Sequence, residues 1–583
     1  MRFDTIIANG RIVDGTGGSA YTADLGITNG RIAAIGRLKD AEAAQRIDAS
    51  GKIVAPGHIS NHAHYDVALF WDPYCSNSGE NGITTVANAN CGFGIAPVKP
   101  SDRERNMLMM ANTEQIPVSH QKAALDWNWT DFPSYLERVR ALGKGVNIVT
   151  FLPLNPLLIY VMGIDGAKSR RPTAAEYRQL EQLINEAMDA GAIGISMSVM
   201  GVAGNSHVDY DGSPMPTYAM DHDVAIELAR MLARRGEGVI QMLSQIVTFG
   251  DRSVTERVAE AVKGSGVRVL HNIFMTTDAL PDLPAEDKAW LDSLRRKGLD
   301  VTAATLVDRS WVEADIQELD TVMGQLAAIR ELVGIDREAA LKLLHDPAYG
   351  ERLEREYAEM GEASGSAAIE YQTVLAIGDK PELQKFVGRS MTDIGEELGL
   401  SPVQTLLHLG RESGLEIIVR TPLVSGTDVY KAVELISHPG IIAGGSDGGA
   451  HTKTFSKGQY GTDLLIWMVR ETGALTIEEA HFQLSLKPAQ TVNLRDRGAL
   501  LPGFWADILI YDLDELFYDM DRLEVVYDMP QGDWRRKAKA GGYDRILVNG
   551  VTISERDKFT GATPGQLVQV TTDMSAQHAL AAE

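Results

Sequence analysis

Several features that would assign the protein to a common class are missing. Only two cysteines, Cys75 and Cys91, occur in 583 residues, which excludes a disulfide framework and is typical of a reducing compartment. No uninterrupted apolar run is long enough to cross a bilayer. The first residues contain no apolar segment of the kind found in secretory signals. We therefore expect a cytoplasmic protein with no membrane partner.

Positive charge is also scarce. The chain has 55 Lys and Arg against 79 Asp and Glu, a net charge of −24. Nucleic acid binding requires a basic surface, so we exclude nucleic acid as a partner. The sequence contains no glycine-rich phosphate loop and no Gly-x-Ser-x-Gly motif, so neither nucleotide chemistry nor serine hydrolysis has sequence support.

Both ends of the chain carry β-hairpin signals. Asn-Gly pairs, which favour the positive φ of a type I′ turn, occur at Asn9-Gly10, Asn29-Gly30 and Asn549-Gly550 between β-rich residues. A further β-rich run covers 507–511. These signals predict one small β-sandwich-like domain built from both termini, and two unrelated β-pieces are the alternative.

The middle of the chain alternates between helical and strand patterns. A capping box at Thr173 and Glu176 begins one helix, and Leu180, Ile184 and Ala187 follow on a single face. Short apolar runs predict strands at 53–64, 84–91, 146–152, 192–195, 238–242, 267–271, 300–305 and 441–447. Parallel strands alternating with amphipathic helices over this length predict a TIM-type (β/α)8 barrel, so the fold class is α/β.

The predicted domain boundaries follow from these patterns. Residues 1–56 and 491–570 form the small β-domain, and 57–490 form the barrel. A charged, helical stretch without clear strands at about 308–400 predicts an insertion between late barrel strands. We expect 571–583 to be a flexible tail.

Candidate metal ligands stand at the ends of predicted strands. His62 and His64 are two residues apart, so both side chains leave a strand on the same side. Cys91, His271 and Asp447 end three other candidate strands, where barrel enzymes place their catalytic groups. Together these five side chains suit zinc. Taken singly, each of the last three has an alternative interpretation. Cys91 is then a small core residue, His271 a hydrogen-bonded structural residue and Asp447 part of a turn.

This constellation suggests hydrolysis by metal-activated water. A metal polarises a carbonyl and lowers the pKa of water, and a carboxylate can move the proton to the leaving group. We assign that role to Asp447. His451, four residues later, contacts substrate or supports the site, or else belongs to a surface loop.

Six segments resemble one known family. They read IIANGRIVDG (6–15), APG (55–57), HAHYD (62–66), ANCGFG (89–94), GSDGGAH (445–451) and LPGFWAD (501–507). In this order they are similar to the N-acyl-D-amino-acid deacylases, or D-aminoacylases, of the amidohydrolase superfamily, most of all to a long-chain branch. The resemblance implies a zinc-binding barrel with a small β-domain. It also implies His62, His64, Cys91 and His271 as metal ligands and Asp447 as the base.

Three positions depart from the family pattern. Ser60 stands where an aspartate is common, and Gln241 where a metal-binding histidine ends the fifth strand. Because glutamine binds zinc poorly, the chain binds either one zinc ion or two. Ile273 replaces a lysine that holds the substrate carboxylate, which suggests a substrate with an uncharged or apolar part. Gln241 and Ile273, with His451, are thus candidate substrate or supporting residues.

The sequence therefore predicts a zinc-dependent hydrolase that cleaves an amide-type C–N bond of a small N-acyl compound. Hydrolysis of a lactone, ester or carbamate on the same apparatus is the alternative. A catalytically inactive scaffold protein is a third reading, which the joint presence of the metal-ligand candidates disfavours. A homo-oligomer is a further possibility, which rests only on analogy with other barrels of this superfamily.

Overall fold

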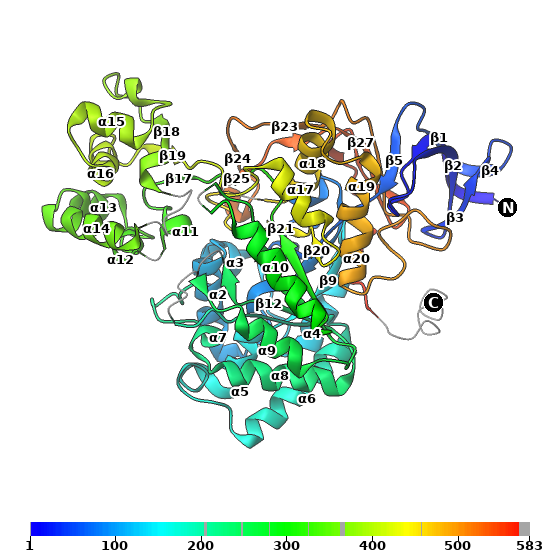
Figure 1. The fold of residues 1–583 in the computed structure, drawn as a ribbon, viewed down its shortest axis with the longest axis horizontal. Helices are drawn as coiled ribbons and strands as arrows, with labels where there is room; N and C mark the ends of the chain where they lie inside the picture. Colours follow the sequence, from blue (N-terminus) through cyan, green and yellow to red (C-terminus); the bar gives the residue numbers. More distant parts are fainter. Residues whose placement is uncertain are drawn as a thin grey trace.

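A computed structural model describes residues 2–202, 207–246, 249–278, 280–324, 326–361, 368–455 and 457–570. The predicted tail, 571–583, lies outside the described residues. Figure 1 shows three regions: strands of the N-terminal segment at one end, a core of strands and helices, and a separate lobe of residues from the middle of the sequence at the other end.

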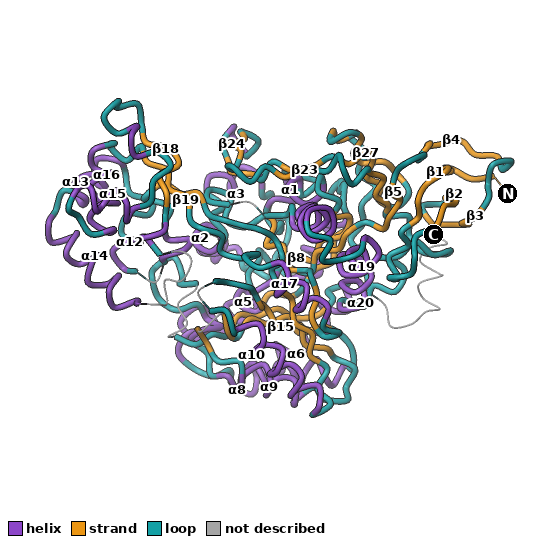
Figure 2. Tube along the Cα trace, turned by 45° about the horizontal axis from the view of Figure 1, so that its top comes forward, coloured by secondary structure: helices purple, strands orange, loops and turns teal. Residues whose placement is uncertain are grey.

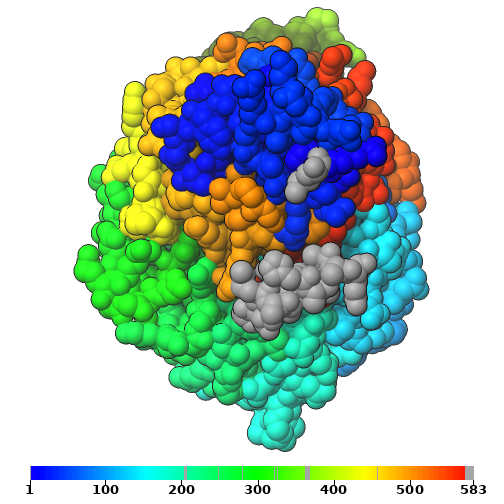
Figure 3. Space-filling view, turned by 90° about the vertical axis from the view of Figure 1, so that its right-hand side faces the viewer, coloured from blue at the N-terminus to red at the C-terminus, as the bar shows by residue number. Residues whose placement is uncertain are grey.

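A nine-stranded sheet joins the two ends of the chain. Its order is β29-β28-β27-β22-β5-β1-β2-β3, with β4 beside β1. The strands are β1 (Arg2–Ile12), β2 (Tyr21–Thr28), β3 (Arg31–Gly36), β4 (Glu42–Asp48), β5 (Ile53–Pro56), β22 (Ile508–Tyr511), β27 (Tyr543–Val548), β28 (Val551–Glu555) and β29 (Lys558–Phe559). Antiparallel pairing of β5 with β22 makes the connection. In Figure 3 the N-terminal residues accordingly lie against residues of the C-terminal part.

Two of the three Asn-Gly pairs form the predicted turns. Asn29-Gly30 connects β2 with β3, and Asn549-Gly550 connects β27 with β28, each with positive φ at both residues. The hairpin predicted at Asn9-Gly10 is wrong. There β1 continues through a bulge, with Asn9 at φ 61°, and pairs with β2 on both sides of it. Asn-Gly favours positive φ, and a bulge uses that conformation as readily as a turn.

Short parallel strands form the centre of the molecule. They are β6 (His58–Ser60), β7 (His62–Ala63), β8 (Ile83–Asn88), β9 (Asn147–Thr150), β10 (Leu152–Pro153), β11 (Gly194–Ser198), β12 (Val239–Leu243), β15 (Arg268–Phe274), β16 (Val301–Thr305), β20 (Ile441–Ile442) and β21 (Gly445–Gly448). Parallel pairs link β6-β8-β9, then β10-β11-β12-β15-β16-β20, and finally β21-β7. The predicted parallel strands are thus present, several of them divided into two pieces.

Helices cover the outside of these strands, as Figure 2 shows. They include α4 (Phe132–Ala141), α5 (Leu154–Ser169), α6 (Ala174–Ala190), α8 (His222–Arg235), α9 (Ser253–Ala261), α10 (Leu283–Arg296) and α17 (Val429–Ser437). The capping box of Thr173 and Glu176 begins α6, whose buried face contains Leu180, Ile184 and Ala187. The predicted alternation of strands and helices is confirmed.

An apolar cluster lies on the inner side of the parallel strands. Its strand members are Ile59, Ala87, Val149, Val239, Leu270, Ala304 and Ile442. Each of these side chains comes from a different strand segment. Since side chains alternate between the two sides of a strand, the cluster shows which residues of each strand point inward.

The segment between β16 and β20 forms a lobe with its own core. It contains α11 (Asp320–Met323), α12 (Ala327–Arg330), α13 (Arg337–Leu344), α14 (Pro347–Met360), α15 (Met391–Leu398) and α16 (Pro402–Glu412). The expectation of no strands here is wrong, because β17 (Glu313–Asp315), β18 (Thr373–Ile377) and β19 (Ile417–Arg420) form a sheet in the order β17-β19-β18. These strands are three to five residues long, too short to give a clear alternating pattern.

Within the described residues, no helix combines the length and apolar character needed to cross a bilayer.

Two buried histidines near the sheet junction lead to a pH prediction. The rings of His58 and His481 lie 5.5 Å apart between centroids, and His481 Nε2 lies 2.6 Å from Tyr511 Oη. Burial lowers the pKa of His58 from 6.5 to about 3 and that of His481 well below 6.5. Below pH 6.5 the unfolded chain therefore binds protons that the folded chain does not.

We expect acid to destabilise the fold as pH falls from 6.5 toward 3. His58 contributes a loss of about 2 kcal/mol between pH 6.5 and 5, and His481 adds a loss in the same direction. Urea denaturation at pH 7 and pH 5 measures this loss, and His58→Gln should reduce the difference between the two pH values. His345→Gln, at an exposed position, is the control and should keep the full difference. An unchanged difference in His58→Gln would contradict the assignment.

Candidate metal centre

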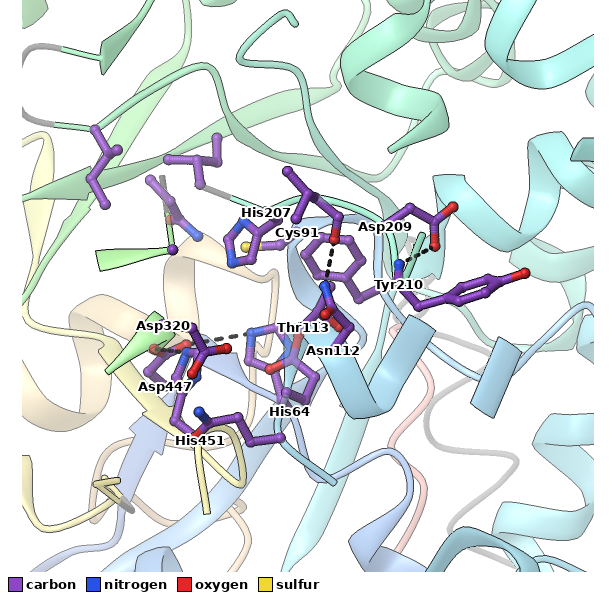
Figure 4. Close-up of a pocket in the computed structure, with 18 of the residues that line it drawn as sticks. His64, Cys91, Asn112, Thr113, His207, Asp209, Tyr210, Asp320, Asp447 and His451 are labelled. Carbon is purple, nitrogen blue, oxygen red and sulfur yellow. Dashed lines mark hydrogen bonds and ion pairs between the residues drawn. The ribbon is translucent and has the colours of Figure 1, made fainter. Parts of the chain in front are cut away.

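A cavity of about 440 Å³ opens beside the carboxyl ends of the central strands. Six of the predicted site residues line it, namely His62, His64, Cys91, Ile273, Asp447 and His451. Figure 4 shows His64, Cys91, Asp447 and His451 around this cavity. Volumes of this size are typical of small-molecule sites.

Backbone pairing with the last strand positions the two histidines. β7 pairs in parallel with β21, which sets His62 opposite Gly445. The backbone N–H of His64 donates to Gly448 O at 2.8 Å. The hydroxyls of Ser60 and Ser446 lie 2.7 Å apart and within 3.2 and 2.9 Å of His62 O, so one can donate to that carbonyl while the other donates to its neighbour. Ser60, the departure from the family pattern, thus helps to hold β7 against β21.

Four potential ligand atoms meet at the cavity wall. His62 Nε2 lies 3.2 Å from His64 Nε2 and 3.5 Å from Cys91 Sγ. Asp447 Oδ1 lies 3.5 Å from His62 Nε2 and 3.4 Å from His64 Nε2. Within the described part of the chain, His62, His64 and Cys91 form a group with ligand atoms within 4.8 Å of one another.

Cys91 lies three residues beyond β8, in a tight turn. Its φ is 57°, and that of Ala89 is 60°, a left-handed conformation that is uncommon for residues other than glycine. Buried side chains hold the turn: Cys91 N donates to Gln241 Oε1 at 2.7 Å, and Gly92 N donates to Ser196 Oγ at 3.1 Å. Gln241, on β12, thus orients Cys91 and is not among the described residues that line the cavity.

Asp447 also adopts a left-handed conformation, with φ 55°. The turn that follows Asp447 passes close to the backbone of His64, just after β7. A Cβ on Gly449 would lie 2.8 Å from His64 C and O, so only glycine allows this approach. This close approach brings Asp447 near His62 and His64.

Burial and the local charges set the ionisation of these groups. Burial lowers the pKa of His62 to about 4, against the opposing effect of Asp447. Burial raises the pKa of Asp447, but the hydrogen bond from His64 and the charges of His62 and His64 outweigh it and hold that pKa well below 3.8. Burial lowers the pKa of His64, yet Glu114 and Asp447 raise it well above 6.5 overall.

The structure does not bring His271 to this cluster. Its Nδ1 lies 3.0 Å from Thr255 Oγ1, and its ring packs against Trp290 on α10, with centroids 4.9 Å apart. On β15 the inward side belongs to Leu270 and therefore also to Asn272, so His271 points toward the helices. Its placement at the site is corrected for that reason.

The other candidates have different positions. Ile273 and His451 line the cavity. His451 N donates to Glu114 O at 2.8 Å, and its Nε2 lies 3.9 Å from Asp447 Oδ2. The surface-loop interpretation of His451 is therefore wrong, because this side chain faces the cavity.

Several lining residues were not predicted from the sequence, among them Glu114, Asn272 and His207. Glu114 Oε1 faces His64 Nδ1 at 3.5 Å, and burial raises the pKa of Glu114 to about 7. The side-chain amide of Asn272 contacts His62 Nδ1. His207 Nδ1 lies 3.0 Å from Tyr218 Oη. Asn272 could have been found from strand alternation, because it points to the side opposite His271. Glu114 and His207 lie outside the central strands, where no such pattern applies.

Part of the chain matches a known protein family. Residues 45–261 match the Amidohydrolase family. The chain contains an amidohydrolase-family domain. The resemblance to D-aminoacylases drawn from the sequence is confirmed, since the chain is similar to the N-acyl-D-glutamate deacylase and the D-aminoacylase of Alcaligenes xylosoxydans xylosoxydans. Identities are 26% and 25%, covering 95% and 97% of this chain and 94% and 97% of the relatives.

A solved structure shows the same fold. The N-acyl-D-glutamate deacylase of Bordetella bronchiseptica, complexed with zinc and a phosphonate inhibitor, superposes with a TM-score of 0.64 at 22% identity. The match covers 98% of this chain and 100% of that one. At this identity the likeness concerns the fold: the parallel strands and helices of the amidohydrolase-family domain, with a small β-domain beside them.

Gln241 provides a test of how the Cys91 turn is held. Gln241→Leu leaves the buried N–H of Cys91 without its acceptor, which we expect to lower the free energy of unfolding by about 1–3 kcal/mol. Urea denaturation measures the loss, and hydrogen exchange at 89–92 should become faster. Gln182→Leu, on the exposed face of α6, is the matched control. Equal stability of the two variants would contradict the proposed support.

Proposed function

We propose that the protein is a metal-dependent hydrolase that cleaves the amide bond of an N-acyl amino acid or a related small amide. The observation that carries the proposal is the meeting of two imidazoles, a thiol and a carboxylate at the wall of one cavity. The names of the similar deacylases support the choice of an amide substrate.

The four ligand atoms fit zinc by their chemistry and their spacing. Bonds of about 2.0–2.3 Å at tetrahedral angles place neighbouring ligand atoms about 3.3–3.7 Å apart. His62 Nε2 lies 3.2 Å from His64 Nε2 and 3.5 Å from Cys91 Sγ, and the ligand atoms of these three residues all lie within 4.8 Å of one another. We therefore assign these four residues to one zinc site, with His62, His64 and Cys91 as the ligands and Asp447 beside the fourth position, which is left for water.

The neighbours of each histidine suit this assignment. An imidazole bound through Nε2 carries its proton on Nδ1 and needs an acceptor there. Glu114 faces Nδ1 of His64, and the amide of Asn272 faces Nδ1 of His62. The nitrogen of the Asn272 amide makes this contact, and its Oδ1 has no hydrogen-bond partner among the described residues. A flip of the amide, which exchanges its oxygen and nitrogen, gives His62 Nδ1 the acceptor.

A second zinc has less support. Gln241 is engaged by Cys91 N, and His271 points toward the helices. The ligands that a second ion would need on these two strands are thus occupied or turned away. We propose one zinc per chain rather than two.

Asp447 is the proposed general base and acid. A bound divalent metal supplies Lewis acidity, which polarises the scissile carbonyl and lowers the pKa of water. Asp447 accepts the proton of the attacking water and delivers it to the leaving nitrogen. Its Oδ2 faces His451 Nε2 at 3.9 Å, which favours the ionised carboxylate that accepts this proton.

Several finer structural points belong to the proposal. The parallel pairs β6-β8-β9, β10 to β20 and β21-β7 support a closed (β/α)8 barrel. We propose the barrel at 57–490 with its insertion, and the small domain from 1–56 and 491–570. The two unpaired cysteines agree with the cytoplasmic location proposed from the sequence. A homo-oligomer remains a proposal by analogy.

Metal analysis tests the ligand assignment. Elemental analysis of the purified protein should give about one zinc per chain, held by His62, His64 and Cys91. Cys91→Ala should lose most of this zinc. Cys75→Ala, at the other buried cysteine outside the cluster, should retain it. A protein that takes up no zinc when zinc is supplied would contradict the mechanism and favour the scaffold interpretation.

A substrate panel tests the reaction. N-acetyl amino acids of both configurations should be hydrolysed faster than lactones, esters and carbamates. Asp447→Asn should reduce kcat by about 10²–10⁴-fold, because the proton acceptor is lost. Asp308→Asn, a buried carboxylate beside Lys457, is the control and should affect stability more than kcat. Faster turnover of esters or lactones would replace the amide proposal by the alternative.

A further inference from the structure

A segment between two strands of the nine-stranded sheet extends toward the insertion. Strands β22 and β27 pair with each other, but the strands within residues 512–542, which connect them, belong to separate two-stranded sheets. We call residues 512–542 the C-terminal arm. It contains β24 (Glu524–Val526) and β25 (Arg535–Lys537). Figure 1 shows both strands between the lobe of the insertion and the core, so the arm lies where these two parts meet.

The arm holds the loop 451–454, which follows the proposed base. Arg536 N donates to Thr452 O at 2.9 Å, and the Arg536 guanidinium donates to Lys453 O. Lys453 Nζ in turn donates to Asp533 Oδ2 at 2.8 Å. These bonds fix the second and third residues of a loop whose first residue lines the cavity.

The loop also lies against the segment that contains Glu114. His451 N donates to Glu114 O at 2.8 Å, and Thr452 Oγ1 donates to Gln115 O at 2.9 Å. The imidazole of His451 faces the proposed base, with Nε2 at 3.9 Å from Asp447 Oδ2. The position of this imidazole relative to the base therefore depends on where the loop is held.

Arg536 also joins the loop 451–454 to the insertion. Its Nη1 lies 3.0 Å from Glu318 Oε2, just before α11, and Asp320 and Arg330 of the insertion line the cavity. Arg536 is only 4% exposed, and bonds from a guanidinium to a carboxylate are strong and directional. One buried side chain thus connects two separate parts of the cavity wall.

We propose that Arg536 is a positioning residue for the proposed reaction, which keeps His451 beside Asp447 by fixing the loop 451–454. The inference rests on the proposed function. Arg536 is not among the described residues that line the cavity, so it acts through the loop. Small displacements of groups near the reacting atoms lower the rate strongly, and a residue outside the cavity can therefore control kcat.

Kinetics of matched variants test this role. Arg536→Met should lower kcat for N-acetyl-DL-leucine by about 10-fold and change KM by less than about threefold, because the loop loses its anchor while no contact with substrate is lost. The control is Arg535→Met, at the neighbouring position of β25, similarly buried but paired with Asp528. It should keep kcat within about threefold of the wild-type value. Elemental analysis should give the wild-type zinc content for both variants, which separates the effect from loss of metal.

Coupling to His451 distinguishes positioning from a general loss of stability. If Arg536 acts through the loop, Arg536→Met should lower kcat by less than about threefold when His451→Ala is already present. Arg536→Lys keeps a positive charge and a donor, and should recover at least about threefold of the lost kcat. If Arg536→Met does not fold, Lys453→Met replaces it with the same expectations, because it removes the bond from the loop to Asp533.

Hydrogen exchange tests the inference without turnover. The His451 N–H is bonded to Glu114 O, so its exchange reports how firmly the loop is held. Peptides covering 448–455 should exchange at least about threefold faster in Arg536→Met and at the wild-type rate in Arg535→Met. This result supports the inference even if the wild-type protein hydrolyses no N-acetyl amino acid, in which case only the proposed reaction fails.

Four results would overturn the inference. They are an unchanged kcat in Arg536→Met, an equal loss of kcat in Arg535→Met, an equal effect of Arg536→Met with and without His451→Ala, and unchanged exchange of the loop. The second would assign Arg536 a structural role, and the third a role independent of His451. In each case hydrolysis by the wild-type protein would leave the proposed reaction intact.

Discussion

The parallel pairing of β7 with β21 is the constraint on which the site depends. It joins the first and last strands of the central unit and brings His62 and His64 to Asp447. The turn after Asp447 reaches His64 only because Gly449 has no side chain. Gln241 on β12 holds the backbone of Cys91 beside them. The ligand set is therefore a property of the strand arrangement, and loss of register would separate all of its members.

Burial makes His62 suitable for metal binding. It lowers the pKa of His62, which keeps the imidazole neutral, as a metal ligand must be. It also makes an isolated charge costly, and the carboxylates of Glu114 and Asp447 both face histidines. The central strands thus supply the chemistry. The insertion, with its separate core, supplies part of the wall that meets the substrate.

Much of the fold could be predicted from local patterns. The capping box of α6 and the Asn-Gly turns at Asn29 and Asn549 involve neighbouring residues, so their structures follow from local backbone preferences. Asn9-Gly10 did not follow its pattern, because pairing with β2 on both sides converts a potential turn into a bulge. The strands of the insertion were missed because they are short and gain stability only from one another.

By itself, the sequence determined which types of side chain form the site and that they stand at strand ends. The spacing of His62 and His64 and the position of Asp447 followed from strand alternation and from the direction of parallel strands. Only the tertiary structure decided that His271 points outward while Asn272 points inward, because alternation gives two equivalent phases until a core selects one. It alone also brought Glu114 and Arg330 into the cavity wall, since their positions depend on contacts between segments distant in sequence.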